Sequence, residues 1–148
     1  MRARFCSPAR AWMLAVLQVG FLGCAGKAAN QQRDPTEERL YIIGKAYGQA
    51  NQRLGRPPKT FEELKPNLEP DAPADLLRSP RDGEPFVILW GLPYSHIAPG
   101  RDPFTVAAYE KNGVSGVRHV LRFPLQVLEM TDDQLSKAAF PPGHRPPG

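Results

Sequence analysis

The chain has 148 residues, the length of about one domain, and 41% of them are hydrophobic, too few for a polytopic membrane protein. Its formal net charge is +4, and three of its 19 basic residues are arginines near the start. Without these three, 16 basic and 15 acidic residues remain, and the net charge is about +1. A charge this close to neutral leaves no basic stripe for phosphate backbones, so we expect no nucleic-acid partner.

Residues 1–23 have the composition of a signal peptide. Arg2, Arg4 and Arg10 precede a predominantly apolar run over residues 11–22, and no acidic residue accompanies them. This run fits the ~7–15 residues of a signal-peptide core and falls short of the ~20 that cross a bilayer. The sequence therefore predicts a removable leader and an exported product.

The segment Phe21-Leu22-Gly23-Cys24 resembles the lipobox of bacterial lipoprotein precursors. The resemblance implies cleavage between Gly23 and Cys24, a diacylglycerol thioether on the Cys24 sulfur and, often, acylation of the new amine. Two or three acyl chains hold a protein at a membrane far more firmly than one. The family usually has Leu where this chain has Phe21. Alternatively, Cys24 is a chance cysteine and an ordinary signal peptidase cuts nearby, after Ala28.

Residues 24–33 predict a lipidated cysteine and a flexible tether, because Ala25 to Arg33 are small or polar. A main helix is predicted from Pro35 to Leu54, since Asp34-Pro35-Thr36-Glu37 has the features of a helix start. Apolar residues then recur at spacings of three and four and form one buried stripe: Leu40, Ile43, Tyr47, Ala50 and Leu54.

Two glycines on this helix, Gly44 and Gly48, either mark a close approach to a sheet or are merely tolerated there. A second helix start at Thr60-Phe61-Glu62-Glu63 predicts a short helical turn that ends before Pro66. A proline-rich loop is expected to follow over residues 67–81.

Four segments of the second half predict β-strands: 85–90, 104–109, 117–122 and 125–129. The first is apolar throughout, so we expect a central strand covered on both faces. Lys111-Asn112-Gly113 predicts a hairpin between the second and third strands. The fourth follows Pro124 and is placed at an edge of the sheet.

The C-terminal part predicts a last short helix and a tail. Thr131 and Gln134 have the spacing of a helix cap, with Leu135, Ala138 and Ala139 on the buried side, and residues 141–148 read as a proline-rich disordered tail. The predicted fold class is α+β, with one main N-terminal helix packed on a three- to four-stranded antiparallel meander and a short C-terminal helix. It forms a single domain over residues 34–140.

The order of these motifs also resembles the globular part of type II secretion pseudopilins. The residues that carry the resemblance are Leu54, Gly55, Arg56, Pro58, Thr60, Leu64, Trp90, Gly91, Pro93 and Tyr94. The resemblance implies a shared helix-and-sheet scaffold, and fold alone does not fix function. Pseudopilins carry a prepilin leader and a long apolar helix with an early Glu, whereas this chain has the Cys24 leader. Filament assembly through such a helix is therefore not expected.

Residues with catalytic chemistry are sparse. Ser95, His96 and Asp102 suggest a hydrolase site, but neighbouring loop residues rarely meet in triad geometry and no Gly-x-Ser-x-Gly motif is present. The chain contains no Cys-x-x-Cys or His-Glu-x-x-His spacing, so we expect no metal and no cofactor. We therefore expect a protein that is not an enzyme.

Trp90, Tyr94 and Phe104 flank the loop over residues 91–103. If they are exposed together they form a docking surface for a protein partner; alternatively they fill the core. The leading hypothesis is a lipid-anchored domain that faces the periplasm, at the cell membrane or outer membrane, and binds a partner or assists envelope assembly. The alternatives are a pseudopilin-like secretion component and a hydrolase with a loop site near His96.

Overall fold

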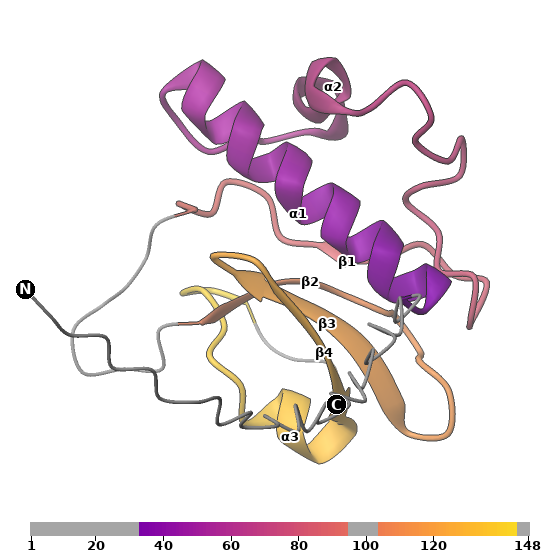
Figure 1. Ribbon diagram of the computed structural model, residues 1–148. Coiled ribbons are helices and arrows are strands. Elements are labelled where there is room, and N and C mark those ends of the chain that lie inside the picture. Colours follow the sequence, from indigo (N-terminus) through magenta and orange to yellow (C-terminus); the bar gives the residue numbers. More distant parts are fainter. Residues whose placement is uncertain (1–32, 95–103, 145–148) are drawn as a thin grey trace, which may run out of the picture. The chain divides into compact units, whose positions relative to one another are not determined.

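The computed structural model describes residues 33–94 and 104–144 (Figure 1). The chain divides into two units, Met1–Gln31 and Gln32–Gly148, and all described residues belong to the second. Its elements are α1 (Pro35–Leu54), α2 (Phe61–Leu64), the 3-10 helix η1 (Lys65–Asn67), β1 (Val87–Ile88), β2 (Thr105–Tyr109), β3 (Val117–Phe123), β4 (Gln126–Thr131) and α3 (Asp132–Ser136). The predicted α+β fold is confirmed. Within the described ranges, no helix is long and apolar enough to cross a membrane.

Helix α1 has the predicted limits, and the expected residues set both ends. Asp34 Oδ1 accepts a hydrogen bond of 2.8 Å from Thr36 N, and Gly55 ends the helix with a φ of 65°, a conformation that suits a residue without a Cβ. Four of the five residues of the predicted stripe are buried, with Leu40, Ile43, Tyr47 and Ala50 at most 1% exposed, and Leu54 is partly buried. Figure 1 shows α1 lying across one face of the sheet.

The two glycines of α1 mark a close approach. A Cβ on Gly44 would lie 2.6 Å from Leu125 Cδ1 and 3.0 Å from Leu121 Cδ1, and one on Gly48 would lie 2.9 Å from Tyr94 Cζ. Contacts this short require the neighbouring side chains to move. Close packing on the sheet is therefore correct for Gly44, whereas Gly48 packs closely against the side chain of Tyr94 in the loop after β1.

The sheet is an antiparallel meander with the strand order β1-β2-β3-β4, which confirms the edge position of the fourth strand. The prediction of a central strand over residues 85–90 is wrong, because the strand is limited to Val87 and Ile88 and lies at the edge of the sheet, next to β2. Before it, Pro85 forms only an isolated bridge with Arg78. The run is apolar throughout for another reason. Phe86 and Ile88 contact the core cluster under α1, while Val87 and Leu89 contact the cluster on the other side of the sheet.

The two short helices differ in how they are capped. Thr60 precedes α2 but makes no side-chain cap bond; instead Glu63 Oε2 accepts a hydrogen bond from Lys59 N at 2.8 Å. The predicted helical turn ended before Pro66, but in the structure η1 follows α2 directly and includes Pro66. At α3, both bonds of the capping box between Thr131 and Gln134 are present, as predicted.

The C-terminal segment packs on the face of the sheet opposite α1. The ring of Phe140 meets Tyr109 at 6.1 Å between centroids, and His144 stacks on Phe140 at 5.1 Å. His144 Nε2 also lies 3.2 Å from Tyr109 Oη. Within the predicted disordered tail, His144 therefore contacts the domain, whereas Pro142 and Gly143 are exposed.

Candidate functional site

The structure places only part of the predicted site residues. Gly23, Cys24, Ser95, His96 and Asp102 lie outside the described residues. The lipidation site and the hydrolase alternative therefore stay predictions.

The three aromatic residues predicted as a partner surface have different surroundings. Trp90 stacks on Tyr47 at 6.2 Å between ring centroids, and Tyr94 packs on Phe123 at 5.0 Å. Both are partly buried beside the core cluster under α1. Phe104 instead lies 4.8 Å from the guanidinium of Arg122. Packing accounts for Trp90 and Tyr94, and their role as a partner surface stays a prediction.

Tyr47 joins this aromatic group to the loop after β1. Its Oη accepts a hydrogen bond of 2.8 Å from Leu92 N and lies 3.1 Å from Leu92 O. Burial raises the pKa of Tyr47 to about 12, although hydrogen bonds with the backbone of Gly91 and Leu92 oppose the shift. The phenol therefore keeps its proton and acts as a fixed link between α1 and the loop.

A buried polar cluster joins the 79–81 loop to β3 and the end of β2. Glu110 is fully buried, and its carboxylate accepts hydrogen bonds from Ser79 Oγ at 2.6 Å and His119 N at 2.8 Å. Arg81 Nη1 lies 3.8 Å from Glu110 Oε2 and 2.5 Å from His119 Nδ1. Arg81 also reaches the exposed Glu129 at 3.0 Å. A buried charge is thus surrounded by donors and by a cation.

The bonds of this cluster fit a structural role. Burial raises the pKa of Glu110, but hydrogen bonds from His119 and Ser79 lower it by more, so the net pKa is lowered and the carboxylate is ionised. The Ser79 hydroxyl donates to this carboxylate and not to His119, and Ser79 is 1% exposed. A nucleophile requires access to substrate, which the buried Ser79 hydroxyl lacks. The cluster holds the 79–81 loop against the sheet.

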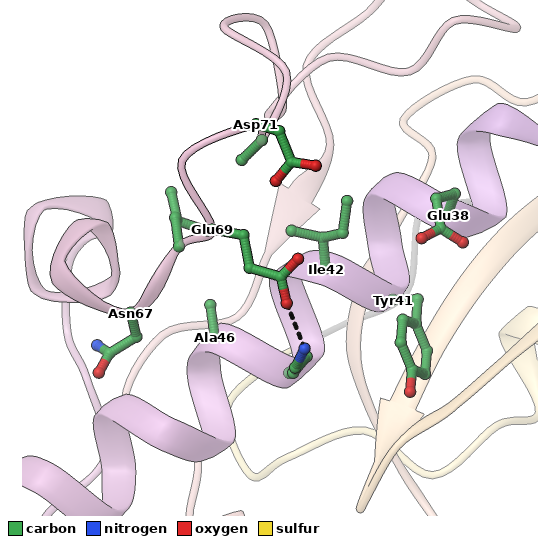
Figure 2. Close-up of a pocket in the computed structure, with 10 residues that line it drawn as sticks. Glu38, Tyr41, Ile42, Ala46, Asn67, Glu69 and Asp71 are labelled. Atoms are coloured by element: carbon green, nitrogen blue, oxygen red, sulfur yellow. Dashed lines mark hydrogen bonds and ion pairs between the residues drawn. The ribbon is translucent and has the colours of Figure 1, made fainter.

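A groove with charged side chains in its lining lies between α1 and residues 67–72. We call it the α1 groove; it has a volume of about 170 Å³. Glu38, Tyr41, Ile42 and Lys45 line it from α1, where spacings of three and four place them on one face. Figure 2 shows Glu69 and Asp71 reaching from the opposite segment toward Ile42.

The lining of the α1 groove has an excess of negative charge. Three carboxylates, from Glu38, Glu69 and Asp71, face one ammonium group, from Lys45. Lys45 Nζ lies 2.5 Å from Glu69 Oε1, and this contact raises the pKa of Lys45 and lowers that of Glu69. Asp71 makes no hydrogen bond or ion pair with another described residue. Among the residues that line the groove, no cation therefore pairs with Glu38 or Asp71.

An arginine from outside the lining meets the groove at Glu38. Arg33 Nη1 lies 3.3 Å from Glu38 Oε2, and the same guanidinium lies 4.1 Å from the centroid of the Tyr41 ring. Carboxylate and aromatic face together form a common environment for a guanidinium. The Glu38 carboxylate and the Tyr41 ring, at one end of the groove, therefore already bind the guanidinium of Arg33.

Within 33–94 and 104–144, no group of three or more His, Cys, Asp or Glu side chains could hold a metal ion. Comparison of the chain with protein families, with curated proteins and with solved structures finds no match in any of the three.

Sequence reasoning missed both the Glu110 cluster and the α1 groove. Ser79 and Glu110 are 31 residues apart, and Lys45 and Glu69 are 24 apart. The sequence contains no local pattern that joins such positions. The spacing of Glu38, Tyr41 and Lys45 on one helix face was the available signal, but it did not show what lies opposite that face.

Proposed function

We propose that the chain is an exported lipoprotein, held at a membrane by acyl chains on Cys24, whose α+β domain binds a partner protein or assists envelope assembly without catalysing a reaction. The observation that carries the proposal is the apolar run over residues 11–22. It follows three arginines and ends directly before Gly23 and Cys24. The domain then faces the periplasm, from the cell membrane or the outer membrane.

The length of the tether supports a role close to the membrane. Nine residues, 25–33, separate Cys24 from Asp34, the residue that caps α1. A fully extended chain covers about 3.3–3.6 Å per residue, so these nine residues span at most about 32 Å. A domain on such a tether stays near the lipid surface and meets partners that are themselves in the envelope.

The distribution of charge in the domain supports binding. The buried charge of Glu110 is engaged in bonds that hold the fold. The charge of the α1 groove lies at the surface, where Asp71 is exposed and makes no ion pair with another described residue. Charged groups that face water steer the encounter of partners and select among them. We therefore expect the partner to bind at the α1 groove.

The proposal is tested by expressing the chain and its Cys24→Ser variant in a bacterial host fed a labelled fatty acid. Serine has no thiol and cannot form the diacylglycerol thioether, so the Cys24→Ser protein should lose the acyl label and should not reach the mass of the processed wild type. The other cysteine provides a matched control, because Cys6→Ser changes a residue of the leader and should keep the label. If Cys24→Ser keeps the label and is processed to the corresponding mass, the proposal is wrong.

A further inference from the structure

We infer that the α1 groove is a binding site for one cationic side chain, arginine or lysine, presented by a segment of a partner protein, and that Arg33 occupies part of the site in the free domain. The inference names the partner's chemistry and in that sense rests on the proposed binding function. The geometry of the groove does not depend on lipidation.

The size of the groove limits what it can hold. Its volume of about 170 Å³ is smaller than the ~300–1,000 Å³ of pockets that bind drug-sized ligands. It is well above the ~10–15 Å³ that a cavity needs to hold one water molecule. The groove therefore has room for a single side chain and not for a whole cofactor.

The charge of the lining selects a cation. Glu38 and Asp71 approach from opposite walls, while Lys45 is paired with Glu69 and cannot neutralise both of them. A guanidinium between two carboxylates makes charge-assisted hydrogen bonds, which are about twice as strong as neutral ones. An anionic group would meet three carboxylates and is disfavoured.

Arg33 shows that one end of the groove accepts a guanidinium. It contacts Glu38 and the Tyr41 ring from the chain segment that leads into α1. Its side chain is 43% exposed, and exposed ion pairs contribute only about 0–1 kcal/mol. A second guanidinium from a partner can therefore displace Arg33 from Glu38 and Tyr41 at little cost. Arg33 acts as an internal competitor located at the end of the predicted tether.

A polypeptide fits the groove better than a free amine. A site for one side chain supplies little net affinity, because association itself costs several kcal/mol. Backbone and flanking side chains of a partner segment add contacts along the exposed surface of α1 and residues 67–72. The proposal therefore commits to a protein segment that carries an exposed Arg or Lys.

The test uses the full processed chain in non-ionic detergent, titrated with the peptide Ala-Ala-Arg-Ala-Ala and followed by amide chemical shifts. A peptide with citrulline in place of arginine has nearly the same shape without the charge. The arginine peptide should shift amides of residues 38–46 and 67–72, and the citrulline peptide should not. Equal binding of both peptides, or shifts confined to other residues, would overturn the inference.

Two variants test the roles of individual residues. Asp71→Asn should weaken binding by about threefold, the size of one exposed ion pair, whereas Arg33→Ala should strengthen it by a similar factor because the competitor is gone. Asp133→Asn and Lys137→Ala, which change the same charges on the exposed pair at α3, should leave the affinity unchanged. If Arg33→Ala and Asp71→Asn behave like these controls, the assignment of the site is wrong.

The outcome is separable from that of the Cys24 experiment. Loss of the acyl label with intact peptide binding contradicts the membrane anchor alone. Lack of peptide binding by a protein that carries the label contradicts the groove assignment alone.

Discussion

Glu110 is the side chain whose surroundings are most sharply defined. It is fully buried and receives hydrogen bonds from Ser79 and His119, with Arg81 as the nearest cation. Removing one residue from a buried cluster of charged and polar side chains lowers the stability of the fold, because it leaves hydrogen-bond donors or a charge without a partner. The cluster therefore fixes the position of the 79–81 loop relative to β3.

The replacement Glu110→Gln should lower the free energy of unfolding by about 1–3 kcal/mol, since the amide presents a donor to groups that already donate. Urea unfolding at neutral pH measures this difference. Glu129→Gln is the matched control, because Glu129 contacts the same Arg81 but its side chain is 60% exposed. The control should change stability by less than about 1 kcal/mol. Equal losses in the two variants would contradict the role assigned to Glu110.

The wild type and the Glu110→Gln variant should also differ in how their stability depends on pH. Because the folded-state pKa of Glu110 lies below its ordinary value of 4.5, its ionisation stabilises the fold fully above that value. This contribution is lost as the pH falls from 4.5 through the lowered folded pKa. The stability difference between wild type and Glu110→Gln should therefore narrow in acid. A difference that widens below pH 4.5 would show that the shift has the opposite sign.

The contact between α1 and the sheet depends on the absence of a side chain at Gly44. A Cβ there would meet Leu121, which is 1% exposed in the central strand β3, and Leu125. Overpacking a core of this kind costs about 1–3 kcal/mol, which exceeds the ~1 kcal/mol that Ala gains over Gly in a helix.

Gly44→Ala should accordingly lower the midpoint of thermal unfolding. Gly48→Ala is the matched control on the same helix, because its Cβ would meet the ring of Tyr94, which is only partly buried and can swing away. Circular dichroism melting curves should show a clear loss for the first variant and little change for the second. A Gly44→Ala protein as stable as wild type would mean that the helix and sheet are not this close.

The elements that the sequence predicted well have local causes. Asp34 and Gly55 fix the ends of α1, and the Thr131–Gln134 capping box fixes the start of α3, so neighbouring residues sufficed. The segment around Val87 was misplaced because an apolar run without alternation indicates burial on both faces and does not tell a central strand from an edge strand.

The candidate site was less accessible to sequence reasoning. The partners of Glu110 and the two walls of the α1 groove come from parts of the chain that only the tertiary fold brings together. Of the predicted surface, Trp90 and Tyr94 proved to pack on Tyr47 and Phe123, against the core cluster under α1. Composition could not separate an exposed aromatic group from a packed one.

At the level of the complete protein, the proposal joins a lipid anchor, a short tether and a domain with a negatively charged groove. Arg33 lies where the last two meet, because it ends the predicted tether and contacts Glu38 and Tyr41. A partner that displaces Arg33 would therefore break its ion pair with Glu38 at the start of the domain.

Mass spectrometry of the N-terminal peptide, from protein extracted from bacterial membranes, is the most direct test of the lipoprotein assignment. We expect a peptide that begins at Cys24 and carries a diacylglycerol thioether on its sulfur, with or without a further acyl chain on its amine. A mature N-terminus elsewhere, such as after Ala28, or an unmodified sulfur at Cys24, would contradict the assignment.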